Sequence, residues 1–333
     1  MVRFAILGAG RIGKAHIRAV VAEPRAELVA VADPIQAAAE AAANAHGCDI
    51  RSIDEIAAND DVDAVAICTP TNTHADLIEQ FAKVGKAIFC EKPIDLSLER
   101  VRSCLSVAEA ENATLMLGFN RRFDPDFMAL KSAIDRGDIG DVEMVTITSR
   151  DPGAPPADYI KVSGGIFRDM TIHDFDIARW LLDEEIETVQ AAASVLTDPE
   201  IGKLDDFDSV NLILRTASGK QCTITNSRRA SYGYDQRLEV LGSKGMASAG
   251  NTHESTLEVA GSNGYRRPPL LNFFMERYEA AYANEISAFV AAVADGKTPP
   301  TTGHDGMMAL VLAEAAILSV SESRVVRISE ILG

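Results

Sequence analysis

The segment Ser163–Leu182, SGGIFRDMTIHDFDIARWLL, places Asp169, His173 and Asp176 four and then three residues apart. In a helix this spacing brings the three side chains onto one face. Histidine is the residue in this group whose ordinary pKa suits a general base near pH 7. The segment can therefore hold proton-transfer chemistry, although a helix-capping aspartate and a satisfied core histidine would explain the same residues.

A glycine-rich loop, Gly8-Ala9-Gly10-Arg11-Ile12-Gly13, has the pattern G-x-G-x-x-G. Gly8 permits a tight turn, Gly10 allows close approach of a pyrophosphate, and Gly13 allows close packing of the helix on the strand. The free N–H groups at the start of the helix then face the phosphates. Because the loop follows an apolar strand and opens a helix, we expect a dinucleotide site that includes Gly8, Gly10, Arg11, Ile12 and Gly13.

Asp33 lies twenty residues after Gly13, at the end of the second predicted strand. An acidic side chain at this position accepts hydrogen bonds from the adenine ribose 2′-hydroxyl and repels a 2′-phosphate, which favours NAD over NADP. The third strand ends in CTPTNTH, so Thr69, Pro70 and Asn72 are further cofactor-binding candidates at the carboxyl edge of the sheet. For His74 we favour a capping role over chemistry.

The first half of the chain alternates apolar strands with amphipathic helices, which is typical of βαβ units in a parallel sheet. After about residue 120 a helix is followed by several strands in succession. SVNLILRT and QCTITN flank the turn Ser218-Gly219 and alternate polar with apolar residues, which predicts a hairpin with one polar face. RLEVLG, MASAG and STLEVA predict further antiparallel strands, and helices are expected over 274–295 and 306–321.

These patterns predict an α/β protein of two domains. An N-terminal Rossmann-type parallel sheet over residues 1–121 would bind NAD. A C-terminal α+β domain over residues 122–333, with an open and largely antiparallel sheet, would bind substrate and form oligomer contacts.

Composition excludes several function classes. The net charge of −17 should repel nucleic acid and anionic membrane surfaces. No stretch of eighteen or more consecutive apolar residues is present, and the N-terminus lacks a signal-peptide pattern, so we expect a cytoplasmic protein. The five cysteines have no metal-ligand spacing and are expected to be reduced: Cys48, Cys68, Cys90, Cys104 and Cys222.

The motif Glu91-Lys92-Pro93, together with the glycine loop and an α+β second half, resembles the Gfo/Idh/MocA family of oxidoreductases over the whole chain. The segments GFNRRFDP, YIKVSGGIFRDMTIHDFDIARW and YGYDQRLEVLGSKG resemble its inositol 2-dehydrogenase branch. That resemblance implies NAD-dependent oxidation of myo-inositol to 2-keto-myo-inositol in myo-inositol catabolism, and a homotetramer.

The resemblance implies a catalytic group of Lys92, Asp169 and His173, and a cofactor site that also includes Glu91. In this group His173 would be the base that accepts the hydroxyl proton. The ammonium of Lys92 would stabilise the negative charge that develops on the reacting oxygen. Asp169 could orient the imidazole or bind a neighbouring hydroxyl. No metal is expected.

A polyol needs several hydrogen-bonding side chains, because its hydroxyls leave little apolar surface to hold. The candidates are Asn120, Arg122, Asp151 and Tyr232. For Arg122 a surface ion pair is an equal alternative. Tyr232 and Tyr234 are two residues apart, so they cannot face the same side of an extended segment, and we favour Tyr232.

Three alternatives stay open. The first is a dehydrogenase of scyllo-inositol, another inositol isomer or a pyranose sugar. The second is a non-catalytic NAD-sensing regulator, which would be expected to lack Lys92 or His173. The third is a metal-dependent hydratase or aldolase built around His173, Asp174 and Asp176, which adjacent helix positions suit poorly.

Overall fold

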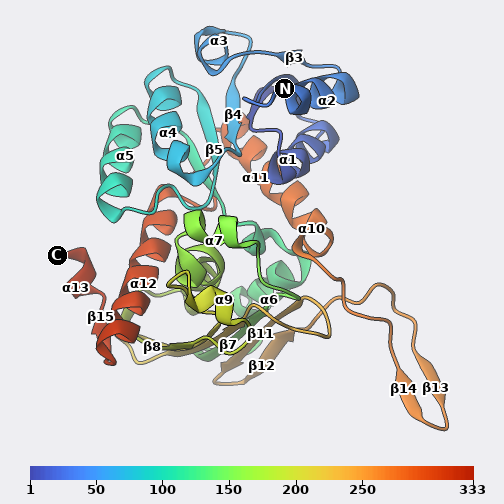
Figure 1. The fold of residues 1–333 in the computed structure, drawn as a ribbon, viewed down its shortest axis with the longest axis vertical. Helices are drawn as coiled ribbons and strands as arrows, with labels where there is room; N and C mark the ends of the chain where they lie inside the picture. Colours follow the sequence, from blue (N-terminus) through green and yellow to red (C-terminus); the bar gives the residue numbers. More distant parts are fainter. The chain divides into compact units, whose positions relative to one another are not determined.

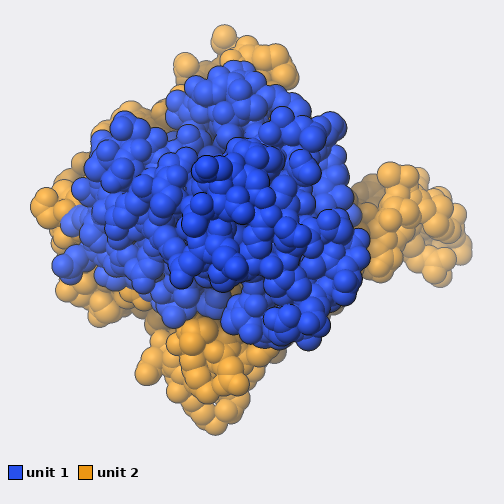
Figure 2. Space-filling view, turned by 90° about the horizontal axis from the view of Figure 1, so that it is seen from above, with its two compact units in different colours: residues 1–123, 279–310 blue, residues 124–278, 311–333 orange.

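The computed structural model describes all 333 residues and divides into two compact units (Figure 2). Unit 1 comprises Met1–Phe123 and Glu279–Leu310, and unit 2 comprises Asp124–Tyr278 and Val311–Gly333. The sequence predicts a single boundary, with domains over 1–121 and 122–333. In the structure, residues 279–310 also belong to unit 1. Helix α11 (Glu279–Asp295) accounts for this return, because its Phe289 packs edge-on against Phe4 and Phe89, with ring centroids 5.8 Å apart in each pair.

Unit 1 contains a six-stranded parallel sheet in the order β3-β2-β1-β4-β5-β6 (Figure 1). Its strands are β1 (Val2–Leu7), β2 (Ala26–Ala32), β3 (Asp49–Ile50), β4 (Ala64–Ile67), β5 (Ala87–Glu91) and β6 (Leu115–Gly118). The connecting helices are α1 (Arg11–Ala22), α2 (Gln36–His46), α3 (Ile53–Ala58), α4 (His74–Lys83) and α5 (Leu98–Ala110). Every residue of β4 is buried, as expected for a central strand covered on both faces. The predicted parallel sheet is confirmed.

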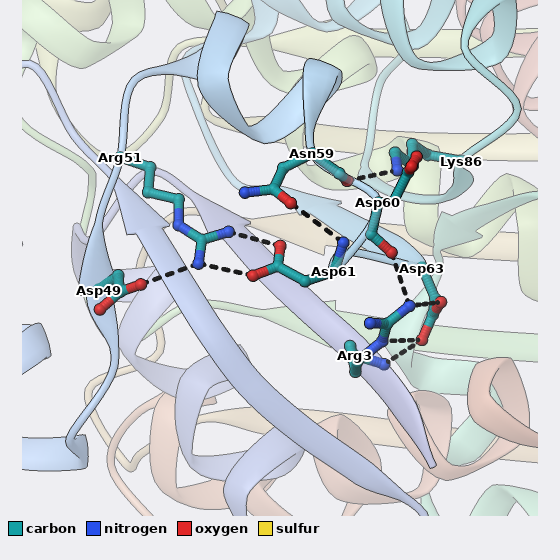
Figure 3. Close-up of polar contacts among 8 residues, drawn as sticks. All are labelled: Arg3, Asp49, Arg51, Asn59, Asp60, Asp61, Asp63 and Lys86. Atoms are coloured by element: carbon teal, nitrogen blue, oxygen red, sulfur yellow. Dashed lines mark hydrogen bonds and ion pairs between the residues drawn. The ribbon is translucent and has the colours of Figure 1, made fainter.

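Charged side chains from β1, from the residues around β3 and from the loop before β4 contact one another (Figure 3). Arg51 donates to both carboxylate oxygens of Asp61, at 2.6 and 2.8 Å, and to Asp49 at 2.8 Å. Arg3 binds Asp63 through its backbone N–H and its guanidinium. Hydrogen bonds from Arg3 and Arg51 lower the pKa of Asp63 and Asp61, respectively. These ion pairs connect β1 and the residues around β3 with the loop that precedes β4.

Unit 2 contains a seven-stranded mixed sheet in the order β12-β11-β7-β10-β9-β8-β15. Its strands are β7 (Val142–Arg150), β8 (Ile186–Ser194), β9 (Ser209–Thr216), β10 (Gln221–Ser227), β11 (Asp235–Gly242), β12 (Gly245–Ala249) and β15 (Val326–Arg327). Only β7 and β10 pair in parallel. The predicted β9–β10 hairpin is confirmed: Val210, Leu212 and Leu214 are buried and alternate with more exposed positions.

The helices of unit 2 are short. They are α6 (Pro125–Asp135), α7 (Ala157–Ser163), α8 (Ile172–Leu182), α9 (Pro199–Gly202), α10 (Phe274–Arg277) and α13 (Ser329–Leu332). The continuous helix expected over 274–295 is wrong, because the chain breaks between α10 and α11 at Tyr278. The antiparallel strand expected at STLEVA is confirmed only in its last residues: β13 (Val259–Gly261) pairs with β14 (Gly264–Arg266) in a hairpin that extends away from the main sheet (Figure 1).

Helix α12 (Gly303–Glu322) contributes its first residues to unit 1 and the rest to unit 2. It is the one helix long and apolar enough to cross a membrane, with a mean hydropathy of 1.3 over eighteen residues. However, 61% of that window is buried inside the protein. The apolar composition of α12 therefore also fits a helix in the core of a protein.

The buried Asp208 anchors the loop that follows β8 in unit 2. Its carboxylate accepts hydrogen bonds from the backbone N–H groups of Leu196 and Thr197, each at 2.8 Å, and of Asp198 at 3.0 Å. Burial alone would raise the pKa of Asp208, but these bonds outweigh it and lower the pKa to about 2. Its carbonyl accepts from the N–H of Arg228 at 2.8 Å, which connects this loop to the site described below.

Asp208→Asn should lower the free energy of unfolding by about 2 kcal/mol at pH 7. Because the pKa is lower in the folded state than the value of about 3.9 in the unfolded chain, the stabilisation is complete above about pH 5 and is lost as pH falls through 4 toward 2. Urea denaturation at pH 7 and pH 3 measures the difference from wild type, with the exposed Asp60→Asn as control. A difference that stays constant between the two pH values would contradict this account.

Candidate active site

The glycine loop of unit 1 forms the turn between β1 and α1. Gly8 has a φ of +95°, and a Cβ there would lie 2.7 Å from the carbonyl oxygen of Cys68. At Gly13 a Cβ would lie 1.8 Å from the carbonyl oxygen of Gly8. Gly10 is exposed, and a Cβ there would meet nothing within 4 Å. Gly8 and Gly13 are thus required for packing, whereas Gly10 leaves the backbone open to a ligand.

Asp33 follows β2 and fixes the glycine loop. Its Oδ2 accepts from the backbone N–H of Ala9 at 2.6 Å, and its Oδ1 accepts from that of Ile35 at 2.8 Å. The side chain is half-buried. Each carboxylate oxygen can accept a second hydrogen bond, so the geometry leaves acceptor capacity for a ribose hydroxyl beside the loop.

The loops after β4 and β5 are tied together by His74. Its Nε2 lies 2.8 Å from the carbonyl oxygen of Thr69, and its Nδ1 lies 2.7 Å from that of Pro93. His74 is 1% exposed, but the expected capping role is wrong, because α4 has no side-chain cap bond and both ring nitrogens of His74 contact loop carbonyls instead. Within these loops Thr69 binds the hydroxyl of Thr73, and Asn72 is exposed. His74 therefore joins the loop after β4 to Pro93, the residue that follows Lys92.

Glu91 is held by a residue that sequence reasoning missed. His16 Nε2 lies 2.7 Å from Glu91 Oε1, and the His16 side chain is fully buried. Beneath Glu91, a Cβ at Gly118 would lie 3.2 Å from the carboxylate. His16 shares the buried face of α1 with Gly13, Ile17 and Val20, so its spacing signalled only a core position. The Glu91-Lys92-Pro93 turn is thus restrained at both its first and its third residue.

In unit 2, Asp169 and His173 lie where a π-helical turn, Phe167–Thr171, runs into α8. Both side chains are half-buried, whereas Asp176 is fully buried. Asp169 Oδ1 accepts from the hydroxyl of Tyr159 at 2.8 Å, and Oδ2 lies 3.6 Å from Arg228 Nη1. Such turns often occur at functional sites. Sequence reasoning missed Tyr159 and Arg228, which contact Asp169 from α7 and from the loop after β10.

A buried polar network anchors the start of α8 to the sheet. Asp174 accepts from Ser149 Oγ at 2.6 Å and from Asn226 Nδ2 at 2.7 Å. Asn226 Oδ1 accepts in turn from Thr171 Oγ1 at 2.7 Å. Both oxygens of Asp174 therefore serve the attachment of α8 to β7 and β10. This use of Asp174 weighs against a metal-ligand set with His173.

Of three further substrate candidates, one is buried and two have contacts of their own. Asn120 is buried, and Asp151 exchanges backbone hydrogen bonds with Ser227 and Ala230, at 2.9 and 2.7 Å. Arg122 forms an ion pair of 3.0 Å with Asp305, whose Oδ2 also accepts from the backbone N–H of Thr302 at 2.8 Å. A surface ion pair is the alternative expected for Arg122, but this one is largely buried, with side-chain exposures of 10% and 15%.

Tyr232 and Tyr234 lie in a turn rather than an extended segment. Tyr232 is 52% exposed and Tyr234 is 6% exposed, so they do point to different sides. The Tyr232 hydroxyl donates to Asp235 Oδ2 at 2.6 Å and accepts from Arg150 at 3.0 Å. A hollow of about 530 Å³ beside Tyr232 includes neither Asp169 nor His173 in its lining. A substrate role for Tyr232 stays a prediction.

Comparison with known proteins assigns the family. Residues 2–119 match the model of the oxidoreductase family with an NAD-binding Rossmann fold, and residues 127–248 match the GFO/IDH/MocA C-terminal domain. The chain belongs to the Gfo/Idh/MocA family of oxidoreductases. An inositol 2-dehydrogenase of Rhizobium meliloti strain 1021 is 63% identical over 98% of this chain and 99% of its own.

Solved structures agree with this assignment. A myo-inositol dehydrogenase of Corynebacterium glutamicum has a TM-score of 0.95 at 43% identity, covering 98% of each chain. A scyllo-inositol dehydrogenase of Lactobacillus casei with bound NAD(H) and scyllo-inositol has a TM-score of 0.91 at 29% identity, covering 99% of each chain. The predicted combination of a Rossmann-type sheet with an α+β unit is confirmed.

Gly10→Ala should weaken NAD binding at least about tenfold, because the added methyl group occupies the surface that a pyrophosphate must approach. The fold should tolerate the change, since nothing lies within 4 Å of the added Cβ. Fluorescence titration with NAD measures the affinity, and thermal denaturation checks the fold. A Gly10→Ala protein that binds NAD as tightly as wild type would rule out this role of the loop.

Proposed function

We propose that the protein oxidises myo-inositol to 2-keto-myo-inositol with NAD as hydride acceptor, in myo-inositol catabolism. The observation that carries the proposal is the 63% identity to an inositol 2-dehydrogenase over 98% of the chain. Lys92, Asp169 and His173 are all present at the motifs that the family resemblance identifies. Their presence also argues against the NAD-sensing regulator.

The residues of unit 1 fit NAD. The open backbone at Gly10 suits the pyrophosphate, and Asp33 suits the adenine ribose. Pro34 and Ile35 follow Asp33 and offer no cation to a 2′-phosphate. We infer a cofactor site formed by Gly8, Gly10, Arg11, Ile12, Gly13, Asp33, Thr69, Pro70, Asn72, Glu91 and Lys92.

The proposed chemistry removes a proton from the hydroxyl oxygen and a hydride from the carbon that bears it. NAD, when bound, accepts the hydride, so one alcohol yields one ketone, one NADH and one proton. His173 accepts the hydroxyl proton as general base. The Lys92 ammonium donates a hydrogen bond to the same oxygen and stabilises its developing negative charge.

Asp169 completes the catalytic group as the residue that orients the His173 imidazole or binds a neighbouring hydroxyl. Arg228, 1% exposed, places Nη1 at 3.6 Å from Asp169 Oδ2, so a positive charge lies beside this carboxylate. The polyol ring would be held by Asn120, Arg122, Asp151 and Tyr232. Of these, Arg122 and Tyr232 would have to give up or share the hydrogen bonds described above.

Scyllo-inositol is the second candidate substrate. The Lactobacillus casei enzyme that binds it has the same fold over nearly the whole chain, but at 29% identity. Myo-inositol and scyllo-inositol differ in the orientation of one hydroxyl, so small shifts in the polar side chains decide between them. The 43% identity to the myo-inositol dehydrogenase of Corynebacterium glutamicum favours myo-inositol.

We also infer a cytoplasmic homotetramer. All five cysteines are free, as expected in a reducing compartment.

On the sheet of unit 2, Leu241 is paired in register with Met144 and Met246, and these three side chains are 42–54% exposed. Such an apolar row suits burial against another subunit, and sedimentation equilibrium would show a mass near that of one chain if the inference is wrong.

Initial rates of NADH formation should be highest with myo-inositol and NAD. With NADP in place of NAD the rate should fall at least about tenfold, because Asp33 repels a 2′-phosphate. Absorbance assays across myo-inositol, scyllo-inositol, D-chiro-inositol and D-glucose measure the preference.

Two variants control for the origin of the activity. Lys92→Ala and His173→Ala should each lower kcat at least about a hundredfold without loss of NAD binding. If His173→Ala keeps near-normal turnover, the base is wrongly assigned. If wild type binds NAD but oxidises none of the four compounds, the substrate proposal fails and the regulator becomes the better account.

A further inference from the structure

Three side chains of unit 1 converge behind the Lys92 turn from separate elements. His16 comes from α1, Glu91 from β5 and Glu285 from α11, and one ligand atom from each lies within 4.8 Å of the other two. His16 and Glu285 are both 0% exposed. Glu285 shares the buried face of α11 with Tyr282, Ile286 and Phe289. A carboxyl group is thus placed among apolar side chains, directly below the motif that carries Lys92.

Glu285 has an unusual environment. Both of its carboxylate oxygens are buried without a hydrogen-bond partner. A buried carboxylate without partners is strongly destabilising, and an unsatisfied group in a native protein requires an explanation. The aromatic rings of Phe89 and Tyr282 flank His16, with centroids 4.8 and 5.5 Å from the imidazole, so the surroundings offer little solvation.

The charges around Glu285 favour its neutral form. Burial raises the pKa of Glu285 well above its usual range, and the nearby Glu91 carboxylate raises it further. The titratable groups around it are His16 on α1, Glu91 on β5 and Cys68 after β4. A protonated carboxyl has one O–H to donate. Among these groups the Glu91 carboxylate is the strongest acceptor.

We propose that Glu285 carries a proton and shares it with Glu91, so that Glu285 and His16 together position the turn that holds Lys92. Glu91 then accepts from two buried donors and remains the only anion of the cluster. Glu285 is in this account a positioning residue that acts through Glu91. The positioning role rests on the proposed function of Lys92, whereas the protonation of Glu285 does not.

A divalent cation is the competing explanation for two carboxylates and a histidine. The observed spacing disfavours it, because His16 Nε2 and Glu91 Oε1 are only 2.7 Å apart. Two ligand atoms on a tetrahedral zinc ion lie about 3.3 Å apart, given bond lengths near 2.0 Å. A direct hydrogen bond between His16 and Glu91 explains the short distance, and a proton on Glu285 removes the need for a metal.

Infrared difference spectroscopy tests the protonation directly on the whole protein. We expect wild type to show the carbonyl stretching band of a protonated carboxylic acid at neutral pH. Glu285→Gln should lack this band, and the matched control Glu279→Gln, an exposed acid on the same helix, should retain it. Absence of the band from wild type, or a stoichiometric metal found by elemental analysis, would overturn the proposal.

Turnover tests the positioning role. Glu285→Leu, which removes the donor but fills the space, should lower kcat at least about tenfold while the affinity for NAD changes much less. Glu285→Gln, whose amide still donates, should recover most of that loss. Wild-type turnover in Glu285→Leu, or equal losses in both variants, would contradict the role. If Glu285→Leu does not fold, the infrared comparison of wild type with Glu285→Gln still tests whether Glu285 is protonated.

Discussion

The structure depends first on the parallel arrangement of β1, β4 and β5 in unit 1. Because parallel strands end at one edge of the sheet, the three loops that follow them begin close together. One loop carries the glycines, the next Thr69 and Pro70, and the third Lys92. Hydrophobic burial fixes the strands, but it does not fix the conformation of the loops. Buried polar side chains do so: Asp33 binds the glycine loop, and His74 joins the other two.

The same division of roles holds in unit 2. The apolar side chains of α8 pack on the sheet, but the orientation of its first turn depends on Asp174, Asn226 and Thr171. The nearby Asp169 is held by Arg228 and Tyr159. Burying such groups is costly unless each is paired. The network therefore restricts the helix to one register on the sheet, which is what a residue that must meet a substrate hydroxyl requires.

Much of the fold could be predicted because its signals are local. The continuous apolar run of β4 predicts that the whole strand is buried, and the alternation in β9 predicts that one of its faces is buried. The return of α11 to unit 1 could not be predicted, because it depends on contacts such as Phe4 with Phe289, which are far apart in the sequence. The segment STLEVA, which contains part of β13, has the composition of a strand. Its composition could not show that β13 would pair with β14 outside the main sheet, because strand pairing depends on tertiary context.

Some residues of the site could be predicted from a local motif, and others could not. The glycine loop and the motif around Lys92 have a recognisable spacing, so they could be identified before the structure. His16 and Glu285 could not, since a single polar residue on an apolar helix face gives no sign of what it will meet. Arg228 is likewise one of two adjacent arginines after β10, and only its burial against Asp169 and Asp206 reveals its role.

The central claim is that a hydride leaves the carbon of one inositol hydroxyl and is accepted by NAD. The most direct measurement uses myo-inositol carrying deuterium at carbon 2 and determines by mass spectrometry where the label goes. The account predicts that the reduced cofactor carries one deuterium per molecule and that the product is the unlabelled ketone. Unlabelled NADH together with a product that retains its deuterium would contradict oxidation at that carbon.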